Sequence, residues 1–554
     1  MLSNNNEINE RIKKAWENSQ ERLTKAQAVR GNSGYVDLHS LPVSTEALAL
    51  IPEQEAKSAQ VAAFASKNKE VYVAAADPAT QETKVAVQKL LRQGYRAKIF
   101  LASEDSLVYA WSFYKFVPKV KTISTGRMDA IDTQIEEFAS KFKNREDIAE
   151  SIQSAIHSKS IGRVLEIVLA GALALRASDI HFEAEKGGAR VRYRVDGALQ
   201  DINAELTEGA YKLVVSRIKL LSGLRLNVQN KSQDGRFSFS VGDSAIDLRV
   251  SAIPSEFGET FVLRILDPRV IQLTLKDLGL REDDLEVLSQ EIKRPNGMIL
   301  NTGPTGSGKT TTLYAFLKTI ASSEIKIITI EDPIEYHLDR IEQTQVDKRK
   351  NYTFASGLEA IMRQDPDVIL VGEIRDTETA NTAMQAALTG HLVFSTLHTN
   401  SASGVIPRLI NLGAPVSSIG PALNIVIAQR LIRKICENCK EEATNDPRIE
   451  KVKAIIAALP ERVKKPEALR VMKAKEGGCA TCGQTGYRGR VGIFEILKMG
   501  EEIEFLIQKN AGEAEIQKFA KENGLVTLQQ DGLLKVVAGV STLDELEKVT
   551  GPLE

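Results

Sequence analysis

The segment Gly303-Pro-Thr-Gly-Ser-Gly-Lys309-Thr310 constrains the fold of this chain more than any other feature, because it matches the pattern G-x4-G-K-[ST]. It follows an apolar run, Met298–Asn301, that predicts a strand, and it precedes Thr311–Ile320, whose spacing predicts a helix. Glycines let backbone N–H groups curl around phosphate oxygens without an obstructing Cβ, and the helix N-terminus adds about half a positive charge. The segment therefore predicts a phosphate-binding loop between a strand and a helix.

Nine consecutive residues are predicted to bind the nucleotide: Gly303, Pro304, Thr305, Gly306, Ser307, Gly308, Lys309, Thr310 and Thr311. Lys309 is expected to reach the β- and γ-phosphates, and the Thr310 hydroxyl is expected to ligate Mg²⁺. The alternative is a glycine turn that binds nothing. It is disfavoured because the pattern should arise by chance only about 0.02 times in a chain of this size.

Acidic residues follow two further apolar runs of the same region. Val368–Val371 predicts a buried strand with Glu373 just beyond its end, and Ile325–Ile330 predicts a strand followed by Glu331. Helical patterns alternate with these strands and with Leu392–Ser395, which predicts a parallel, doubly wound sheet. Ligands bind beyond the carboxyl ends of such strands, so Glu331 and Glu373 are candidate catalytic groups. Carboxylates at strand ends are also often merely solvated or capping a helix, and that alternative stays open for each residue taken alone.

The rest of the chain reads as several α/β segments. Strands at Val71–Ala75 and Ala97–Leu101 and a helix at Thr83–Leu91 predict a small N-terminal domain. A helix at Ile161–Ala177 and a series of alternating strands predict a second one. The predicted organisation is a polar lead-in at 1–34, a domain at 35–118, a linker with some helix at 119–150, a domain at 151–270 and a domain at 271–554.

Charge and hydropathy exclude some classes of protein. The 554 residues include 72 basic and 73 acidic side chains, and a net charge of -1 argues against nucleic acid or anionic lipid as the main partner. No apolar run reaches the roughly 18 residues that a membrane span needs, and the polar start lacks the apolar core of a signal peptide. We therefore expect a cytoplasmic protein that does not bind nucleic acid directly.

The four cysteines form two pairs, Cys436 with Cys439 and Cys479 with Cys482. In a reducing compartment such spacing favours a metal over disulfides, and four thiolates make a tetrahedral cage for Zn²⁺. No spare ligand is evident, so the expected site is structural, within a subdomain at about 431–497. The alternatives are four free thiols or an iron–sulfur cluster.

Met362-Arg-Gln-Asp-Pro-Asp-Val-Ile-Leu-Val-Gly-Glu-Ile-Arg-Asp376 resembles the signature of type II/type IV secretion ATPases. The chain also carries the other boxes of that family: the Walker A loop at 303–310, an Asp box from Glu331 to Glu335 and a His box from His391 to His398. The resemblance covers residues 35–540. It implies a RecA-like P-loop ATPase core preceded by a PAS-like α/β domain and a small N-terminal α/β domain, with a tetracysteine zinc subdomain.

The resemblance also implies a function. Members form hexameric rings that hydrolyse ATP with Mg²⁺ to power type IV pilus assembly or extension of a type II secretion pseudopilus. Arg249 and Arg264 match the arginines that reach the γ-phosphate in the family, and His391 and His398 match its catalytic histidines. Either Glu331 or Glu373 is the general base; we favour Glu331 for water activation and Glu373 for positioning Mg²⁺ and water.

The N-terminal domain resembles one that docks on an inner-membrane platform protein or a cytoplasmic adaptor, which implies peripheral association with the membrane through partners. The stretch before Tyr35 lacks the motifs with which some relatives bind cyclic di-GMP, so we expect none to bind. Three alternatives remain: a DNA-uptake motor of the same superfamily, a DNA-translocating or conjugation motor, and a non-catalytic nucleotide-binding scaffold. The retained Lys309, Thr310, Glu331 and Glu373 speak against the scaffold.

Overall fold

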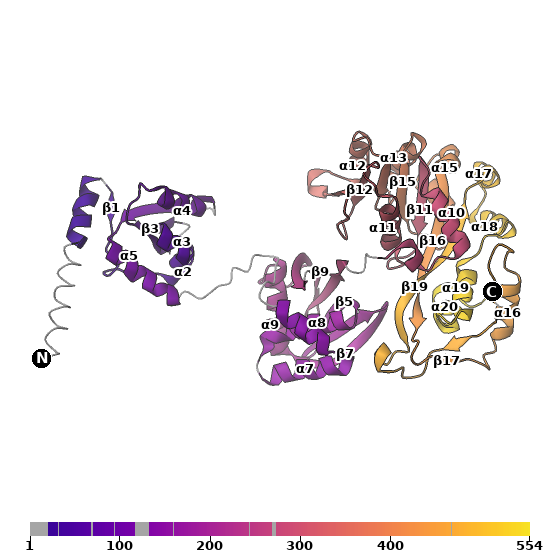
Figure 1. The fold of residues 1–554 in the computed structure, drawn as a ribbon, viewed down its shortest axis with the longest axis horizontal. Coiled ribbons are helices and arrows are strands. Elements are labelled where there is room, and N and C mark those ends of the chain that lie inside the picture. The colour runs from indigo at the N-terminus through magenta and orange to yellow at the C-terminus, as the bar shows by residue number, and fades with distance from the viewer. Residues whose placement is uncertain are drawn as a thin grey trace. The chain divides into compact units, whose positions relative to one another are not determined.

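The computed structural model describes residues 20–31, 33–67, 70–92, 95–116, 132–158, 160–242, 244–268, 273–466 and 468–553. The chain divides into two compact units, residues 1–123 and 124–554 (Figure 1). Most of the predicted lead-in, residues 1–19, lies outside the described ranges. Within those ranges no helix is both long and apolar enough to cross a bilayer.

The first unit is built on a four-stranded sheet with the strand order β1-β4-β3-β2, in which β3 and β4 contain the two strands predicted there. Helix α4 likewise contains the predicted helix, and its buried Ala86 and Leu90 pack on β3. The elements are β1 (Gly34–Tyr35), α2 (Thr45–Leu48), α3 (Glu53–Ser58), β2 (Val61–Lys67), β3 (Glu70–Ala75), α4 (Gln81–Arg92), β4 (Arg96–Leu101), α5 (Glu104–Trp111) and η1 (Ser112–Phe116).

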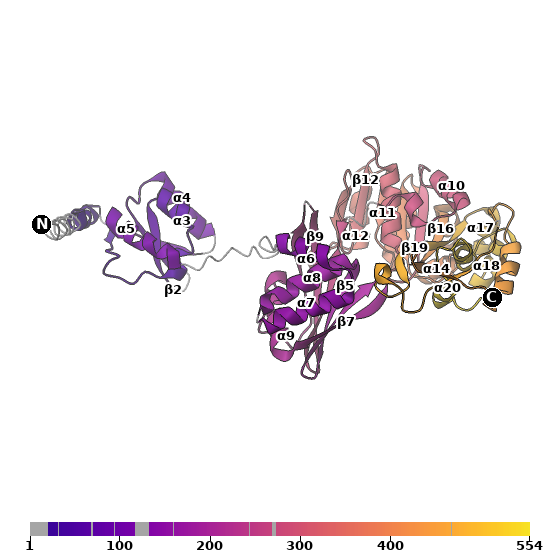
Figure 2. The ribbon, with the colours of Figure 1, turned by 60° about the horizontal axis from the view of Figure 1, so that its bottom comes forward.

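The second unit begins with an antiparallel six-stranded sheet of order β7-β6-β5-β10-β9-β8. Alternate residues of each strand point into a core that helices close from one face (Figure 1, Figure 2). The elements are α6 (Asp132–Lys141), α7 (Arg145–His157), η2 (Ile161–Arg163), α8 (Val164–Ala174), β5 (Ala177–Glu185), β6 (Gly188–Val195), β7 (Ala198–Thr207), α9 (Glu208–Ser222), β8 (Gln233–Val241), β9 (Ser244–Ser255) and β10 (Gly258–Leu266).

Two features of this region differ from the sequence prediction. The prediction for residues 119–150 is a linker with some helix; the described part, residues 132–150, forms α6 and the start of α7, and Ile135, Phe142 and Ile148 lie in the core under the six-stranded sheet. Their apolar residues are spaced for one helix face, which the high charge of the segment obscured. The predicted helix at Ile161–Ala177 ends early, because Arg176 takes a left-handed conformation with φ 56° and the chain turns into β5.

A seven-stranded sheet of order β13-β12-β14-β15-β11-β16-β19 carries the phosphate loop. Its strands are β11 (Gly297–Thr302), β12 (Ile327–Glu331), β13 (Glu342–Gln345), β14 (Val368–Val371), β15 (Leu392–Leu397), β16 (Leu423–Ile435) and β19 (Tyr487–Lys498). The first six strands run parallel, while β19 pairs antiparallel with β16. The α/β class and the P-loop core are confirmed, and the four strands predicted here pair in parallel; β19, which was not predicted, adds an antiparallel edge.

Helices cover both faces of this sheet, as its fully buried central strands β11, β12, β14 and β15 require. Ile299 points into a core with α11, whereas the neighbouring Met298 and Leu300 point into a second core with α12 and α13. The helices before β16 are η4 (Leu275–Leu278), α10 (Glu282–Glu291), α11 (Lys309–Ile320), η5 (Lys348–Lys350), α12 (Phe354–Met362), α13 (Thr377–Leu388), α14 (Val405–Asn411) and α15 (Val416–Ala422).

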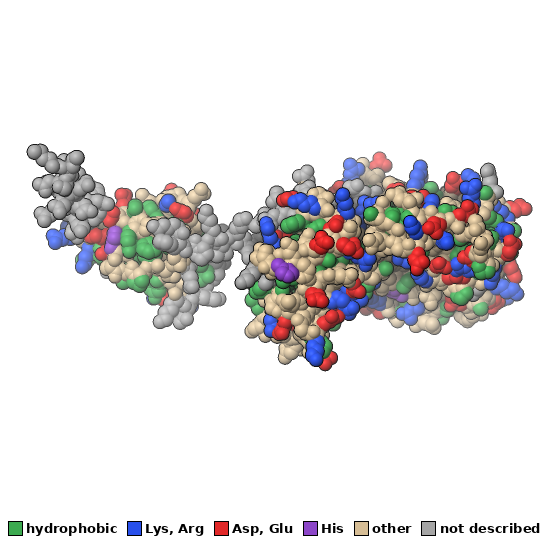
Figure 3. All heavy atoms as spheres, turned by 90° about the horizontal axis from the view of Figure 1, so that it is seen from below, with side chains coloured by type: hydrophobic (Ala, Val, Ile, Leu, Met, Phe, Trp, Pro, Cys, Tyr) green, Lys and Arg blue, Asp and Glu red, His purple; other side chains and the backbone are tan. Residues whose placement is uncertain are grey.

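An insertion separates the two antiparallel strands β16 and β19. It contains β17 (Glu441–Glu442), α16 (Ile449–Ala457), β18 (Met472–Lys473) and η6 (Ala480–Cys482), and after β19 follow α17 (Glu501–Gln508), α18 (Glu513–Glu522), α19 (Leu528–Val537) and α20 (Leu543–Thr550). Leu431 and Leu497, the predicted limits of the metal subdomain, therefore lie within the sheet itself. On the face shown in Figure 3, acidic and basic side chains are intermixed over the second unit instead of gathering by sign.

Candidate functional site

The phosphate loop leaves the carboxyl end of β11 and enters α11 through Gly308, whose φ of 90° is a conformation that favours glycine. A Cβ at Gly308 would lie 2.9 Å from the side-chain amide of Gln429. At Gly303 a Cβ would lie 2.5 Å from the backbone oxygen of Gln429 and 2.9 Å from the Arg430 guanidinium. The two glycines thus bring the loop backbone against β16, and the loop forms the cradle that its motif predicts.

Lys309 lies across the loop. Its Nζ donates to the backbone oxygens of Gly303 at 2.7 Å and Pro304 at 3.2 Å. Burial lowers the pKa of Lys309 to about 8, against the opposing effect of Glu373 and with a further lowering by Arg430. The ammonium is therefore held where a phosphate can replace carbonyl oxygens as its partner.

The other predicted nucleotide-binding residues divide by exposure. Pro304, Thr305, Gly306 and Thr310 are exposed, so their backbone and hydroxyl groups are open to a ligand. Thr311 is half-buried, and the buried Ser307 hydroxyl has no hydrogen-bond partner among the described residues. An unpaired buried hydroxyl in a glycine-rich loop fits an anion-binding role.

Glu373 follows β14 and lies beside the loop. Its carboxylate forms an ion pair with Arg375, and its Oε2 lies 3.7 Å from Nε2 of His398. The strands β11 and β14 both pair in parallel with β15, so the predicted Walker B carboxylate and the loop lysine follow the same ends of neighbouring strands, and the Glu373 charge raises the pKa of Lys309. Burial and the charge of Lys309 lower the pKa of His398, which favours a neutral imidazole next to Glu373.

Glu331, the last residue of β12, is 4% exposed and accepts hydrogen bonds from three uncharged groups. The Tyr314 hydroxyl donates to one carboxylate oxygen, while Thr329 at 2.6 Å and Gln343 at 3.0 Å donate to the other. Burial and the Glu331 carboxylate raise the pKa of Tyr314 well above its usual range. Glu331 is thus fixed in orientation by its neighbours.

The two predicted histidines lie at opposite ends of strand β15. His398 follows β15 on the side of the phosphate loop. His391 precedes the same strand; its backbone oxygen accepts from Gly297 at 3.1 Å, and its ring lies 3.1 Å from the Ala386 oxygen. The six-residue strand separates the two positions by roughly 20 Å. Within this chain the structure therefore does not bring His391 to the phosphate loop.

The two predicted arginines face each other across β9 and β10. Arg249 reaches the segment that follows β12: its guanidinium donates to Glu335 at 3.0 Å and to the Ile334 backbone oxygen at 2.7 Å. Arg264, 55% exposed, is paired with Asp179 at 3.0 Å. Arg249 contacts the predicted Asp box, whereas Arg264 stays on the six-stranded sheet.

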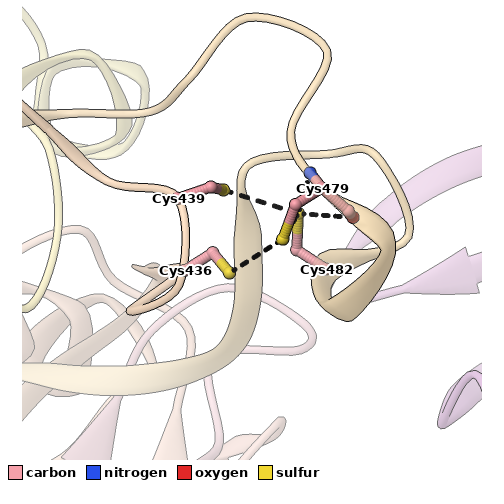
Figure 4. Close-up of side chains that lie close together, drawn as sticks. All are labelled: Cys436, Cys439, Cys479 and Cys482. Carbon is pink, nitrogen blue, oxygen red and sulfur yellow. Dashed lines mark hydrogen bonds between the residues drawn. The ribbon is translucent and has the colours of Figure 1, made fainter.

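The four cysteines converge although 39 residues separate the pairs. Their sulfur atoms all lie within 4.8 Å of one another, and three of the contacts measure 3.8, 3.9 and 3.8 Å (Figure 4). A tetrahedral ion with bonds of about 2.3 Å to sulfur needs sulfur atoms about 3.8 Å apart. The geometry fits Zn²⁺ held by Cys436, Cys439, Cys479 and Cys482.

Backbone groups around the cluster support thiolates. The N–H groups of Cys479 and Gly486 donate to the Cys482 sulfur at 3.1 and 3.2 Å. Burial raises the pKa of Cys482, but these donors outweigh it and leave that pKa lowered, and the backbone of Cys482 lowers the pKa of Cys479 to about 6. Burial raises the pKa of Cys439 to about 12, so that thiol needs a cation to ionise at neutral pH.

Three residues of the site were not predicted. Gln429 accepts from Asn301 at 2.8 Å and from Thr312 at 2.9 Å, Arg430 donates to the Asn400 backbone at 2.9 Å, and Tyr314 binds Glu331. Gln429 and Arg430 interrupt an otherwise apolar run, which is a signal, but their partners come from distant segments. Tyr314 gives no local signal, because an aromatic residue on a helix usually indicates only the core.

Comparison with protein families gives two matches. Residues 154–548 match the family described as type II/IV secretion system protein. Residues 32–114 match the MshEN domain. Together these matches span both compact units.

Curated relatives cover most of the chain. It is 43% identical over 412 residues to type II secretion system protein E of Pseudomonas aeruginosa, which covers 74% of this chain and 79% of that relative. It is 42% identical over 426 residues to type II secretion system ATPase E of Vibrio cholerae, or 76% and 82% of the two chains. It is 34% identical over 534 residues to the type IV pilus assembly ATPase PilB of P. aeruginosa, or 95% and 90%.

Among solved structures, the fold resembles that of the ATPase DotB. The Legionella pneumophila protein superposes with a TM-score of 0.50 at 22% identity and covers 70% of this chain and 94% of its own. The Yersinia pseudotuberculosis protein gives a TM-score of 0.51 at 22% identity, with 71% and 93% covered. At this identity the likeness shows a shared fold.

Proposed function

The chain belongs to the type II/type IV secretion system ATPase family, and from that premise we propose that it is a cytoplasmic motor whose hydrolysis of ATP powers assembly of a type IV pilus or extension of a type II secretion pseudopilus. The observation that carries the proposal is the position of Lys309 and Glu373 beyond the carboxyl ends of β11 and β14, two strands that both pair in parallel with β15. A phosphate-binding loop next to an acidic strand end is the arrangement that hydrolysis requires.

Each site residue has a proposed role. The backbone of residues 303–308 and Lys309 bind the triphosphate. Thr310 and Glu373 would hold Mg²⁺, which when bound neutralises charge on phosphate oxygens. Glu331 orients and deprotonates the attacking water, and the guanidinium groups of Arg249 and Arg264 stabilise the charge of the transferring phosphoryl group. Arg249 must exchange Glu335 for phosphate to do so, which links hydrolysis to movement of the six-stranded sheet.

Assembly and partners follow from the family. We propose a homohexamer that works at the inner face of the cytoplasmic membrane. The first unit would dock on an inner-membrane platform protein or a cytoplasmic adaptor, consistent with the MshEN match at residues 32–114. Sedimentation of the purified chain with a non-hydrolysable ATP analogue tests the hexamer, and a monomer or dimer at saturating nucleotide would overturn it.

ATP turnover by the purified chain tests the enzymatic proposal. The wild-type protein should release phosphate from ATP with Mg²⁺, and the cytoplasmic part of a platform protein should stimulate it. Lys309→Ala removes the ammonium from the loop and should abolish turnover. Lys350→Ala is the matched control, because Lys350 is 81% exposed on a surface turn. Wild-type turnover in the Lys309 variant would refute the assignment, whereas turnover stimulated by DNA would favour the DNA-motor alternative.

Zinc binding by the four cysteines is tested independently of activity. Elemental analysis should find about one zinc per chain. The double variant Cys479→Ser, Cys482→Ser should lose the metal and several degrees of thermal stability, since metal binding stabilises the fold that it needs. Four freely titrating thiols in the purified wild-type chain would overturn the assignment.

A further inference from the structure

Helix α11 begins at the loop lysine and places Tyr314 five residues further on its buried face. The Tyr314 side chain is 1% exposed and packs among apolar residues of the sheet and of α11. A buried phenol needs a hydrogen-bond partner, and this hydroxyl donates to the Glu331 carboxylate. The helix that carries the phosphate-binding lysine is thus joined directly to the proposed base.

The side chains around Glu331 fix the orientation of its carboxylate. Tyr314 from α11, Thr329 from β12 and Gln343 from β13 are the polar side chains that bind its carboxylate. Together they contact both oxygens, so rotation of the carboxylate breaks at least one hydrogen bond. Each donor is uncharged, so the carboxylate keeps its negative charge free of a competing ion pair.

The carboxylate that Tyr314 holds is also connected to the chain that follows it. Gln343 binds both the Glu331 carboxylate and the Tyr336 backbone oxygen, each at 3.0 Å. Arg249 of the six-stranded sheet binds Ile334 and Glu335 in the same turn. Gln343 therefore joins the carboxylate at the start of residues 331–336 to the backbone at their end.

From these contacts we propose that Tyr314 is a positioning residue for hydrolysis, which orients Glu331 toward the attacking water, while Gln343 joins the same carboxylate to the segment bound by Arg249. The inference rests on the proposed function, because it gives Glu331 the role of base. It predicts that the hydroxyl of Tyr314 contributes to turnover and leaves nucleotide binding alone, since the phenol lies behind the carboxylate and away from the loop backbone.

The test compares Tyr314→Phe with Tyr352→Phe, a matched control. The Tyr352 hydroxyl lies 2.7 Å from that of Thr344, so the control also loses one partly buried hydroxyl contact, but not one to Glu331. We expect kcat of Tyr314→Phe to fall roughly ten-fold, with the dissociation constant for a non-hydrolysable ATP analogue within about two-fold of wild type. Tyr352→Phe should change none of these.

Thr329→Val keeps the shape of a second donor and removes its hydroxyl. It should lower kcat and leave analogue binding near wild type, and the double variant with Tyr314→Phe should fall short of the product of the single effects because both act through Glu331. A wild-type kcat in Tyr314→Phe would overturn the inference, as would weaker analogue binding that accounts for the whole loss. If the wild-type chain itself failed to hydrolyse ATP, the proposed function would fall instead.

Discussion

The neighbouring strands β12 and β14 run parallel and both lead to a glutamate, yet the two carboxylates lie in different surroundings. Glu331 is bound by uncharged donors from Tyr314, Thr329 and Gln343. Glu373 lies beside two charged or titratable groups, Arg375 and His398, and its charge raises the pKa of Lys309. Two glutamates at equivalent positions of the same sheet therefore lie in chemically different environments.

The difference teaches how two similar groups acquire separate roles. A carboxylate fixed by neutral donors keeps its orientation and has no cation bound to it, which suits proton removal from water. A carboxylate beside the phosphate loop and its lysine is placed to ligate Mg²⁺ there. The roles of Glu331 and Glu373 stay predictions, and the following changes separate them, from the largest expected effect to the smallest.

Glu331→Gln should lower kcat by about 10³-fold, because an amide cannot accept the proton of water. Affinity for a non-hydrolysable analogue with Mg²⁺ should stay near wild type. Glu373→Gln should instead weaken the magnesium-dependent part of that affinity. Single-turnover hydrolysis and analogue titrations at several Mg²⁺ concentrations measure both. If the two variants exchanged these phenotypes, the assignment of roles would be reversed.

Arg249→Gln should lower kcat by about 10²-fold, since it removes a charged donor and its contact with the segment after Glu331. Arg190→Gln is the control: that arginine lies on β6 of the same sheet and pairs with Glu185 at 2.9 Å. Steady-state ATPase rates at saturating ATP measure the effect. Equal losses in both variants would indicate a general defect of the six-stranded sheet.

Nucleotide affinity should depend on pH through Lys309. With a pKa of about 8, the free ammonium loses its proton as pH rises through 8, so affinity should fall by up to about ten-fold per pH unit above that point. Glu373 raises this pKa, so Glu373→Gln should move the onset to lower pH, while Glu331→Gln leaves it in place. Binding of a fluorescent ATP analogue between about pH 7 and 10 tests this. A common onset in both variants would contradict it.

The histidines should give the smallest effects. His398→Ala removes a neighbour of Glu373 and should lower kcat by about three- to ten-fold. His391→Ala changes a residue at the other end of β15 and should leave kcat within about two-fold of the wild-type value. A larger loss for His391→Ala in the assembled protein would point to a contact with another chain, which sedimentation of the variant would reveal.

Much of the nucleotide-binding fold could be predicted from the sequence, because its signals are local. The loop motif sits between an apolar run and a helical pattern, and the strands around Val368 and Leu392 are buried on both faces. The strand β13 could not be found, since Glu-Gln-Thr-Gln is short and polar. The antiparallel pairing of β16 with β19 was missed because a long insertion separates the two strands.

The candidate site likewise combines residues that local motifs predict with contacts between distant segments that they do not. Motifs predicted Lys309, Glu373 and the four cysteines, whose spacing alone indicates a ligand. They could not predict that Tyr314 and Gln343 hold Glu331, because those contacts depend on how α11 and β13 pack beside β12. Nor could they place Arg249 on Glu335, which depends on the approach of two sheets. The domain boundaries and residue roles stay predictions.

The length of β16 has a mechanical consequence. The strand passes beneath the phosphate loop at Gln429 and ends one residue before Cys436. Its partner β19 begins five residues after Cys482. An ion held by the thiols would join the two strands at the end where the insertion begins, and would resist sliding of one strand past the other under load. Such a crosslink matters in a motor. Without it, a force generated at the nucleotide could be dissipated as sliding of β19, the last strand of the sheet, along β16.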